Sequence, residues 1–198
     1  PTLLEAMEDR DPGRARNAIR IAGESQNPGA VSRLAEILIG EDEALREEAG
    51  KALVRIGDSS ALEVLISMLD SDIDGLPALA AQCLAASASP RAVDPLLQVM
   101  HESIRSRETE SARETIRALG RLARPEATGP LTELLLSKSL LKRRRLRELK
   151  VAAASALGRI PGDDAVGALA QAARSRDSQL RRAAQTALDR RAQALASS

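Results

Sequence analysis

The chain repeats itself along most of its length, and this repetition constrains its fold more than any other feature. Five segments can be aligned from Ala30, Ala61, Ala92, Ala127 and Ala165, at steps of 31, 31, 35 and 38 residues. Each contains an apolar stretch, a charged break, an alanine-rich stretch and a turn with Gly, Pro or Asp. Periods of this length are typical of solenoids, in which helical units stack on their neighbours. We therefore expect an all-α fold.

The two stretches of each repeat both have the pattern of a helix. In the first stretch, apolar residues recur at spacings of three and four, which places them on one helix face. The second stretch is rich in alanine, a strong helix former that lets neighbouring helices approach closely. Three first stretches show the apolar face most clearly, with Val31, Leu34, Ala35 and Leu38, then Leu62, Leu65, Ile66 and Leu69, and then Val93, Leu96, Leu97 and Met100.

The alanine-rich stretches also share a motif, which is Leu-Arg or Leu-Lys, then Ala three residues on, and Ala-Leu three further on. It begins at Leu45-Arg46, Leu149-Lys150 and Leu180-Arg181, whereas Leu76-Pro77 and Ala112 depart from it. This motif resembles that of HEAT repeats, in particular the bacterial HEAT-like repeats that are also found in phycobilin lyases. The resemblance covers nearly the whole chain. It implies a right-handed α-solenoid (an α-α superhelix) of about six helix pairs, with the second helices lining a concave binding face.

The repeat boundaries and the composition suggest one domain. We expect residues 1–198 to form a single repeat domain, and because the chain begins with Pro1 rather than Met, a fragment of a longer protein. The lone Cys83 makes no internal disulfide, so we expect a cytoplasmic protein. Uncharged segments such as Leu76–Pro90 are too short to span a bilayer. The expected repeats are about 2–29, 30–60, 61–91, 92–126, 127–164 and 165–198.

The net charge of +1 hides an asymmetry along the chain. Residues 1–75 hold 8 basic and 16 acidic residues, a net charge of −8. Residues 76–198 hold 21 basic and 12 acidic residues, a net charge of +9. Because sequence order is also spatial order in a solenoid, we expect one acidic end and one basic end.

The densest basic segment runs from Lys142 to Lys150 at the start of a predicted amphipathic helix. Arg143, Arg147 and Lys150 are predicted to form one exposed stripe, at spacings of four and three. Cations at a helix N-terminus oppose the helix dipole, which favours an anionic partner that offsets them. A solvated helix extension without a ligand is the alternative.

The longer repeats contain extra residues at His101–Thr109 and Ser137–Arg145, which we place between the two helices of each pair. Both insertions contain basic residues, in the first Arg105 and Arg107, and adjacent insertions should build one continuous positive surface, here called the basic ridge. The residues predicted to contact a partner are Arg113, Arg117, Arg121, Lys142, Arg143, Arg144, Arg147, Lys150 and Arg181.

These features predict a non-enzymatic interaction scaffold that binds an acidic protein segment through the basic ridge. One alternative is a HEAT-like nucleic-acid-binding protein that uses phosphate contacts. HEAT-like DNA glycosylases recognise bases with aromatic residues, and this chain has no Phe, Tyr or Trp. A phycobilin lyase-like subunit is a further alternative. The acidic residues Glu41–Glu43, Glu47 and Glu48 either stabilise a helix N-terminus or form a patch that supports head-to-tail self-association.

The remaining local candidates favour structural roles. Asp70–Gly75 resembles the start of a calcium loop, but Ala81 stands at position twelve, so we predict a turn. His101 is predicted to cap the end of its helix, and Cys83 to be a buried structural thiol. The sequence contains no catalytic constellation, zinc spacing or glycine-rich phosphate loop. We therefore expect neither an enzyme nor a bound metal or cofactor.

Overall fold

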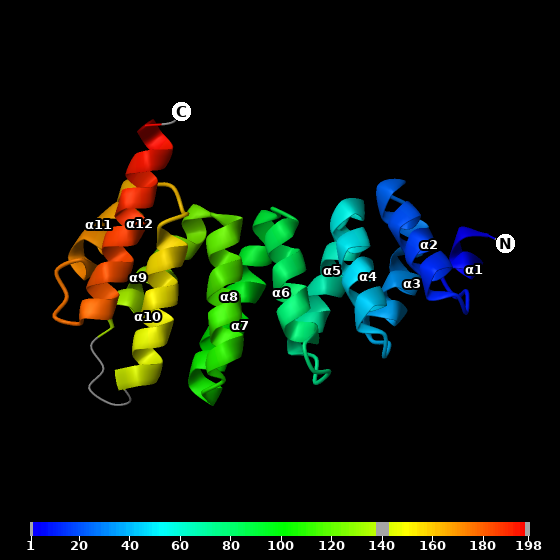
Figure 1. Cartoon of the computed structure of the whole chain (residues 1–198), viewed down its shortest axis with the longest axis horizontal. Coiled ribbons are helices and arrows are strands. Elements are labelled where there is room, and N and C mark those ends of the chain that lie inside the picture. The colour runs from blue at the N-terminus through cyan, green and yellow to red at the C-terminus, as the bar shows by residue number, and fades with distance from the viewer. Residues whose placement is uncertain (1, 138–142, 197–198) are drawn as a thin grey trace. The chain divides into compact units, whose positions relative to one another are not determined.

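The computed structural model describes residues 2–137 and 143–196, and within these ranges the chain is helical and contains no strand (Figure 1). The all-α prediction is therefore confirmed. The helices form six successive pairs, joined in part by short 3-10 turns. In chain order the helices are α1 (Leu3–Ala6), α2 (Pro12–Glu24), α3 (Val31–Leu38), α4 (Glu43–Ile56), α5 (Ser59–Ser67), α6 (Leu76–Ala86), α7 (Val93–Ser106), α8 (Thr109–Leu122), α9 (Thr128–Leu136), α10 (Arg143–Leu157), α11 (Asp163–Ala172) and α12 (Ser178–Ala196).

The helices gather into two compact units, Pro1–Ala88 with α1 to α6 and Ser89–Ser198 with α7 to α12. In unit 1 the second helices α2, α4 and α6 pack in succession, and α3 and α5 pack beside them. Unit 2 has the same plan, with α8, α10 and α12 side by side and α7, α9 and α11 behind them (Figure 1). Within each unit, a second helix therefore contacts the first helix of its own pair and the neighbouring second helices of that unit.

The cores of both units consist of the apolar faces that the repeat pattern predicts. Leu34 and Leu38 of α3 and Leu96 and Met100 of α7 are buried. The outermost members of the predicted faces, such as Leu97, are half-buried. Aliphatic side chains fill these cores, because each layer between paired helices is thin.

Small residues bring the second helices into backbone contact. A Cβ atom added to Gly23 of α2 would lie 2.8 Å from the Cα of Ala52 in α4. In unit 2, a Cβ on Gly158 would lie 2.8 Å from the Cβ of Ala187 in α12. Glycine at these positions is therefore required by the close approach of consecutive repeats.

The end of the second helix has the same geometry in several repeats. Gln26, Gly57, Ala88 and Ala123 all have a positive φ, between 49° and 65°. Their steps of 31, 31 and 35 residues are the steps of the sequence repeat. At two of them the backbone N–H closes the last helical turn, from Gly57 to the Leu53 carbonyl and from Ala123 to the Leu119 carbonyl. These positions end each helix in the left-handed conformation that glycine adopts most easily.

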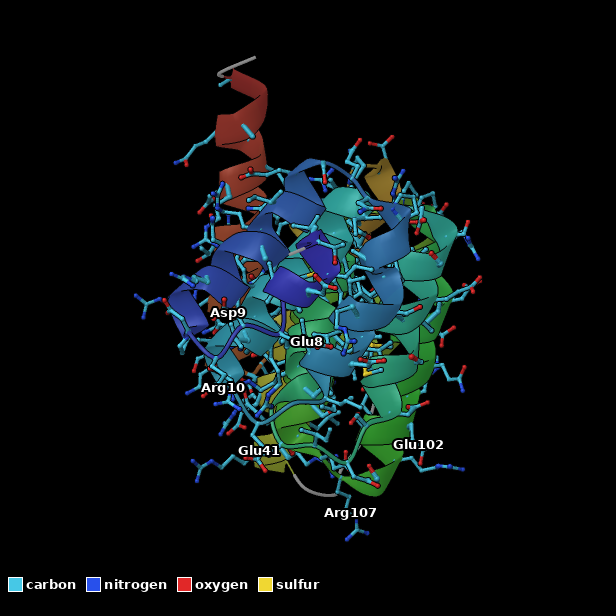
Figure 2. The ribbon with its side chains drawn as sticks, turned by 90° about the vertical axis from the view of Figure 1, so that its right-hand side faces the viewer. Glu8, Asp9, Arg10, Glu41, Glu102 and Arg107 are labelled. Carbon is cyan, nitrogen blue, oxygen red and sulfur yellow. The ribbon has the colours of Figure 1, made fainter. Side chains whose placement is uncertain are left out.

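Acidic residues begin several helices and link neighbouring elements. The carboxylate of Asp42 accepts hydrogen bonds from the backbone N–H groups of Ala44 and Leu45, so it caps α4. Asp42 and Glu43 therefore lie at a helix N-terminus, as one of the two interpretations of the acidic run predicts. Near the N-terminus, Glu8 follows α1 (Figure 2) and pairs with Arg33 of α3.

The insertion expected between the helices of the fourth pair is instead mostly helical. α7 continues to Ser106, and Arg107 ends it with a φ of 72° (Figure 2). The reason is that Ser103 continues the buried face of α7 and its hydroxyl lies 2.8 Å from that of Ser111 in α8. His101 therefore lies inside the helix and is exposed, so the prediction that it caps the helix end is wrong.

The second insertion lengthens a helix as well, within the part that can be described. α10 begins at Arg143, one turn before the position at which α4 and α12 begin relative to the shared Leu-Arg motif. Residues 138–142, which include Lys142 of the predicted ridge, lie outside the described residues.

Two local structural predictions, the turn at Asp70–Gly75 and the burial of Cys83, are confirmed. The segment Asp70–Gly75 forms the predicted turn, in which Gly75 has a φ of 75°. Cys83 is buried as predicted, and burial raises the pKa of its thiol to about 11. Within residues 2–137 and 143–196, no group of three or more His, Cys, Asp or Glu side chains could hold a metal ion.

Candidate functional site

The second helices of unit 2 form a groove. One hollow, of about 490 Å³, lies between α8 and α10. Two further hollows, of about 420 and 400 Å³, lie along α10 and α12 and share Ser155 with the first. These three hollows are here called the arginine groove. They form one surface across three consecutive repeats.

The floor of the groove is made of residues with small side chains. Gly120 and Ala156 lie where α8 and α10 touch, Ser155 directly precedes Ala156, and Ala152 lies one turn earlier on α10. Between α10 and α12 the floor includes Ala187. The hollows are a direct consequence of the alanine-rich second stretch, because its small side chains do not fill the space between neighbouring second helices.

The walls of the groove are strongly basic. Among the lining residues that the structure describes, Glu148 is the one carboxylate, and it lies 3.3 Å from the Nε of Arg144. The arginines of the lining are Arg113, Arg117, Arg121, Arg159, Arg182, Arg190 and Arg191.

Two of the groove arginines pair with carboxylates on their own helix. Arg113 lies 2.9 Å from Glu110, and Arg117 contacts Glu114, each one turn earlier in α8. Exposed pairs of this kind contribute about 1 kcal/mol or less. A ligand carboxylate could therefore replace them at little cost.

Four other groove arginines are exposed and have no partner. Arg121, Arg159, Arg182 and Arg190 make no side-chain hydrogen bond or ion pair with any part of the chain that the structure describes. Their positive charge faces the groove without compensation. This makes them the best placed cations in unit 2 for binding an anion.

Arg191 has a structural role although it lines the groove. Its guanidinium donates hydrogen bonds to the carbonyls of Leu157, the last residue of α10, and of Ile160 and Gly162, which follow that helix. A cation at a helix C-terminus stabilises the carbonyl groups that lack a helical partner. Arg191 therefore fastens α12 to the preceding repeat.

The predicted stripe of Arg143, Arg147 and Lys150 is not one exposed surface. Arg147 is half-buried and lies 3.8 Å from the carboxylate of Asp177, and Lys150 donates a hydrogen bond to the Ser137 carbonyl. Burial lowers the pKa of Lys150. The prediction of exposure is wrong for these two residues because their helix face turns toward the loops before α10 and α12. The side chain of Arg143 lies outside the described residues.

The other predicted contact residues differ in their surroundings. Arg113, Arg117 and Arg121 line the groove, whereas Arg144 is exposed on α10 beside Glu148. Arg181 is exposed and donates a hydrogen bond to the Ser175 carbonyl at 2.9 Å.

The groove also contains arginines that the sequence analysis missed, namely Arg159, Arg182 and Arg190. A signal for two of them was present. Arg159 and Arg190 stand two residues after the leucine of the Ala-Leu step, as Arg121 does in its own repeat. Aligning charged positions across the repeats, rather than searching for dense basic runs, would have found them.

The comparison with protein families supports the resemblance. The family model described as HEAT repeats matches residues 1–82. The prediction of HEAT-like repeats is therefore confirmed for this part of the chain. No curated protein matches the sequence.

Two solved structures share the fold. The complex of CpcE and CpcF of phycocyanin lyase from Nostoc sp. PCC7120 matches with 20% identity and a TM-score of 0.52, over 94% of this chain and 74% of that one. A designed armadillo repeat protein in complex with the peptide (KR)4 matches with 18% identity and a TM-score of 0.50, over 96% of this chain and 98% of that one. The chain thus has the fold of helical solenoid repeat proteins.

The described helices give no sign of a transmembrane segment, since none of them is both long and apolar enough to cross a bilayer.

Proposed function

We propose that this chain is a non-enzymatic interaction scaffold that binds an acidic segment of a partner protein in the arginine groove. The observation that carries the proposal is the set of four exposed arginines without partners, Arg121, Arg159, Arg182 and Arg190, around a groove with a single carboxylate among its described lining residues. A groove that has a floor of small residues and cationic walls suits a peptide segment with anionic side chains.

The energetics require several contacts at once. Each exposed ion pair contributes about 0.2 to 1 kcal/mol, so one arginine would not hold a partner. Arginines on three consecutive second helices contact the same ligand together, and their contributions add along its length. The uncompensated positive potential also speeds the encounter with an acidic partner, in a manner that salt weakens.

The predicted ridge residues would then have unequal roles. Arg113, Arg117 and Arg121 contact the ligand directly, and Arg144 and Arg181 add to the positive potential near the groove. For Lys142 and Arg143 we propose the same indirect contribution. Arg147 and Lys150 retain their contacts with Asp177 and Ser137 and hold α10 in place. We further propose that residues 1–198, with the six expected repeats, act as one repeat domain.

Two other binding modes use the same charges. Duplex nucleic acid would bind through its phosphates, with a steep dependence on salt. A second copy of this chain would offer the acidic residues of unit 1, which would give head-to-tail association. A partner segment remains the preferred ligand because the cations lie within hollows rather than on an open, flat face.

Fluorescence anisotropy with the full chain tests the proposal. A labelled oligoglutamate peptide should bind, and the variant with Arg121→Glu, Arg159→Glu and Arg182→Glu should lose this binding while its circular dichroism spectrum stays unchanged. The matched control replaces Arg10, Arg174 and Arg176 with Glu, three exposed arginines outside the groove lining, and should still bind. Equal loss in both variants, or tighter binding of a duplex DNA than of the peptide at physiological salt, would contradict the proposal.

A further inference from the structure

An arginine recurs at one repeat position of unit 2, within the second helix or directly after it. The position is two residues after the leucine of the Ala-Leu step, and close contacts fix how these positions align. Gly120 follows this leucine in α8 and touches Ala156 of α10, and Gly158 follows it after α10 and touches Ala187 of α12. The three arginines, here called the arginine ladder, are Arg121, Arg159 and Arg190.

Neighbouring arginines of the ladder lie around the same hollow. Arg121 and Arg159 line the hollow of about 490 Å³, and Arg159 and Arg190 line that of about 420 Å³. Since α8, α10 and α12 stand side by side (Figure 1), the ladder runs across the helices rather than along one of them. Any ligand that contacts all three arginines must therefore cross the three helices.

The ladder is not needed to build a repeat of this kind. In unit 1, the equivalent positions of α2, α4 and α6 are Glu24, Arg55 and Ala86. Glu24 and Arg55 are both engaged within the unit, the first with Arg20 and the second with Glu48 at 3.5 Å. The three arginines of unit 2 are exposed and lack partners among the described residues, so no ion pair within the described chain neutralises their charge.

The spacing of the ladder selects the conformation of the ligand. Packed helices lie about 8 to 10 Å apart, which sets the step between successive arginines. A polyproline II helix advances about 3.1 Å per residue with three residues per turn, so every third residue returns to the same side after about 9 Å. In a β-strand, side chains on one side recur every second residue, after about 6.6 Å, which is shorter than the step of the ladder. On an α-helix, neighbouring residues of one face are only about 5 to 6 Å apart.

We infer that the ligand of the arginine groove is a segment in the polyproline II conformation with Asp or Glu at every third position, each carboxylate contacting one arginine of the ladder. This inference rests on the proposed function, because it specifies the acidic partner segment. The small residues on the floor, such as Ala156 and Ala187, let the ligand backbone lie close to the helices. The side chains of the intervening ligand positions point away from the ladder and carry no charge requirement.

Two synthetic peptides of equal composition test the spacing. One repeats Glu-Pro-Pro three times, which presents its carboxylates on one side of a polyproline II helix, and the other has its three Glu residues in succession within the same prolines. Fluorescence anisotropy with the full chain should show about tenfold tighter binding of the spaced peptide, since each additional exposed ion pair contributes a few-fold.

Matched variants test whether the arginine ladder causes the preference for the spaced peptide. Replacing Arg121, Arg159 and Arg190 with Gln should reduce the affinity for the spaced peptide to that for the contiguous one. The control with Arg10→Gln, Arg174→Gln and Arg176→Gln, which changes the net charge equally, should retain the preference. Equal affinity of the unaltered chain for both peptides would contradict the inference that the ladder reads every third residue, and would leave the proposed function intact. Failure of both peptides and of oligoglutamate to bind would overturn the ladder and the proposed function together.

Discussion

A Cβ atom on Gly120 would lie 2.7 Å from the Cα of Ala156, so these two residues mark a place where the backbones of α8 and α10 meet. Replacement of Gly120 by Ala must push the two helices apart and disturb the core behind them. We expect Gly120→Ala to lower the free energy of unfolding by about 1 to 3 kcal/mol, as measured by urea denaturation.

The matched control is Gly167, which lies within α11, is exposed, and has nothing within 4 Å of an added Cβ. Gly167→Ala should stabilise the chain by about 0.5 to 1 kcal/mol, because alanine is the better helix former. If the two variants change stability in the same direction, the backbone contact at Gly120 does not constrain the fold.

Left-handed helix ends provide a second test. Ala123 ends α8 with a φ of 52°, a conformation that glycine adopts without strain. We expect Ala123→Gly to stabilise the chain by about 0.5 to 1 kcal/mol and Gly57→Ala, where φ is 65°, to destabilise it by a similar amount. Thermal unfolding of both variants measures this. A loss of stability in Ala123→Gly would show that the helix end at Ala123 gains nothing from glycine.

The thiol of Cys83 couples stability to alkaline pH. Burial raises its pKa from 9.0 to about 11, so between these values the folded chain holds a proton that the unfolded chain releases. The free energy of unfolding should therefore fall as the pH rises from 9 to 11, by up to about 1.4 kcal/mol per pH unit from this group. Urea denaturation of Cys83→Ala over the same pH range should show a shallower decline. Parallel profiles would mean that the thiol does not titrate differently in the folded state.

Two adjacent arginines should separate stability from binding. Arg191 donates hydrogen bonds to three carbonyls at the end of α10 and just after it, whereas its neighbour Arg190 has no partner among the described residues. We expect Arg191→Gln to lower the free energy of unfolding by about 1 to 3 kcal/mol and Arg190→Gln to leave it nearly unchanged. In the anisotropy assay with the spaced peptide, Arg190→Gln should weaken binding. The opposite pattern would exchange the roles assigned to the two residues.

The sequence was sufficient to predict the helix pairs and their cores, because both follow from local periodicity. Leu34 and Leu96 are buried since their repeats place apolar residues on one helix face, and no distant contact alters that outcome. The turn at Asp70–Gly75 was predictable for the same reason, as its residue types favour turns without help from tertiary contacts.

The exposure of the basic residues was not predictable, because it depends on contacts with residues far away in the chain. Arg147 meets Asp177, and Arg145 donates hydrogen bonds to the carbonyls of Ser103 and Ile104 near the end of α7. Nothing in the spacing of the basic run reveals which of its members contacts a carbonyl and which faces solvent. The run was conspicuous for its density, whereas the ladder is dispersed and becomes visible only in the alignment of repeats.

Each hollow of the groove is bounded by the second helices of two consecutive repeats, and this has an evolutionary consequence. Duplication of one helix pair in unit 2 would lengthen the groove and add one arginine to the ladder in the same step. Loss of a pair would shorten the surface by the same amount and leave the others intact. The length of the ligand that fits would then change with the number of helix pairs, while each arginine would still bind one carboxylate.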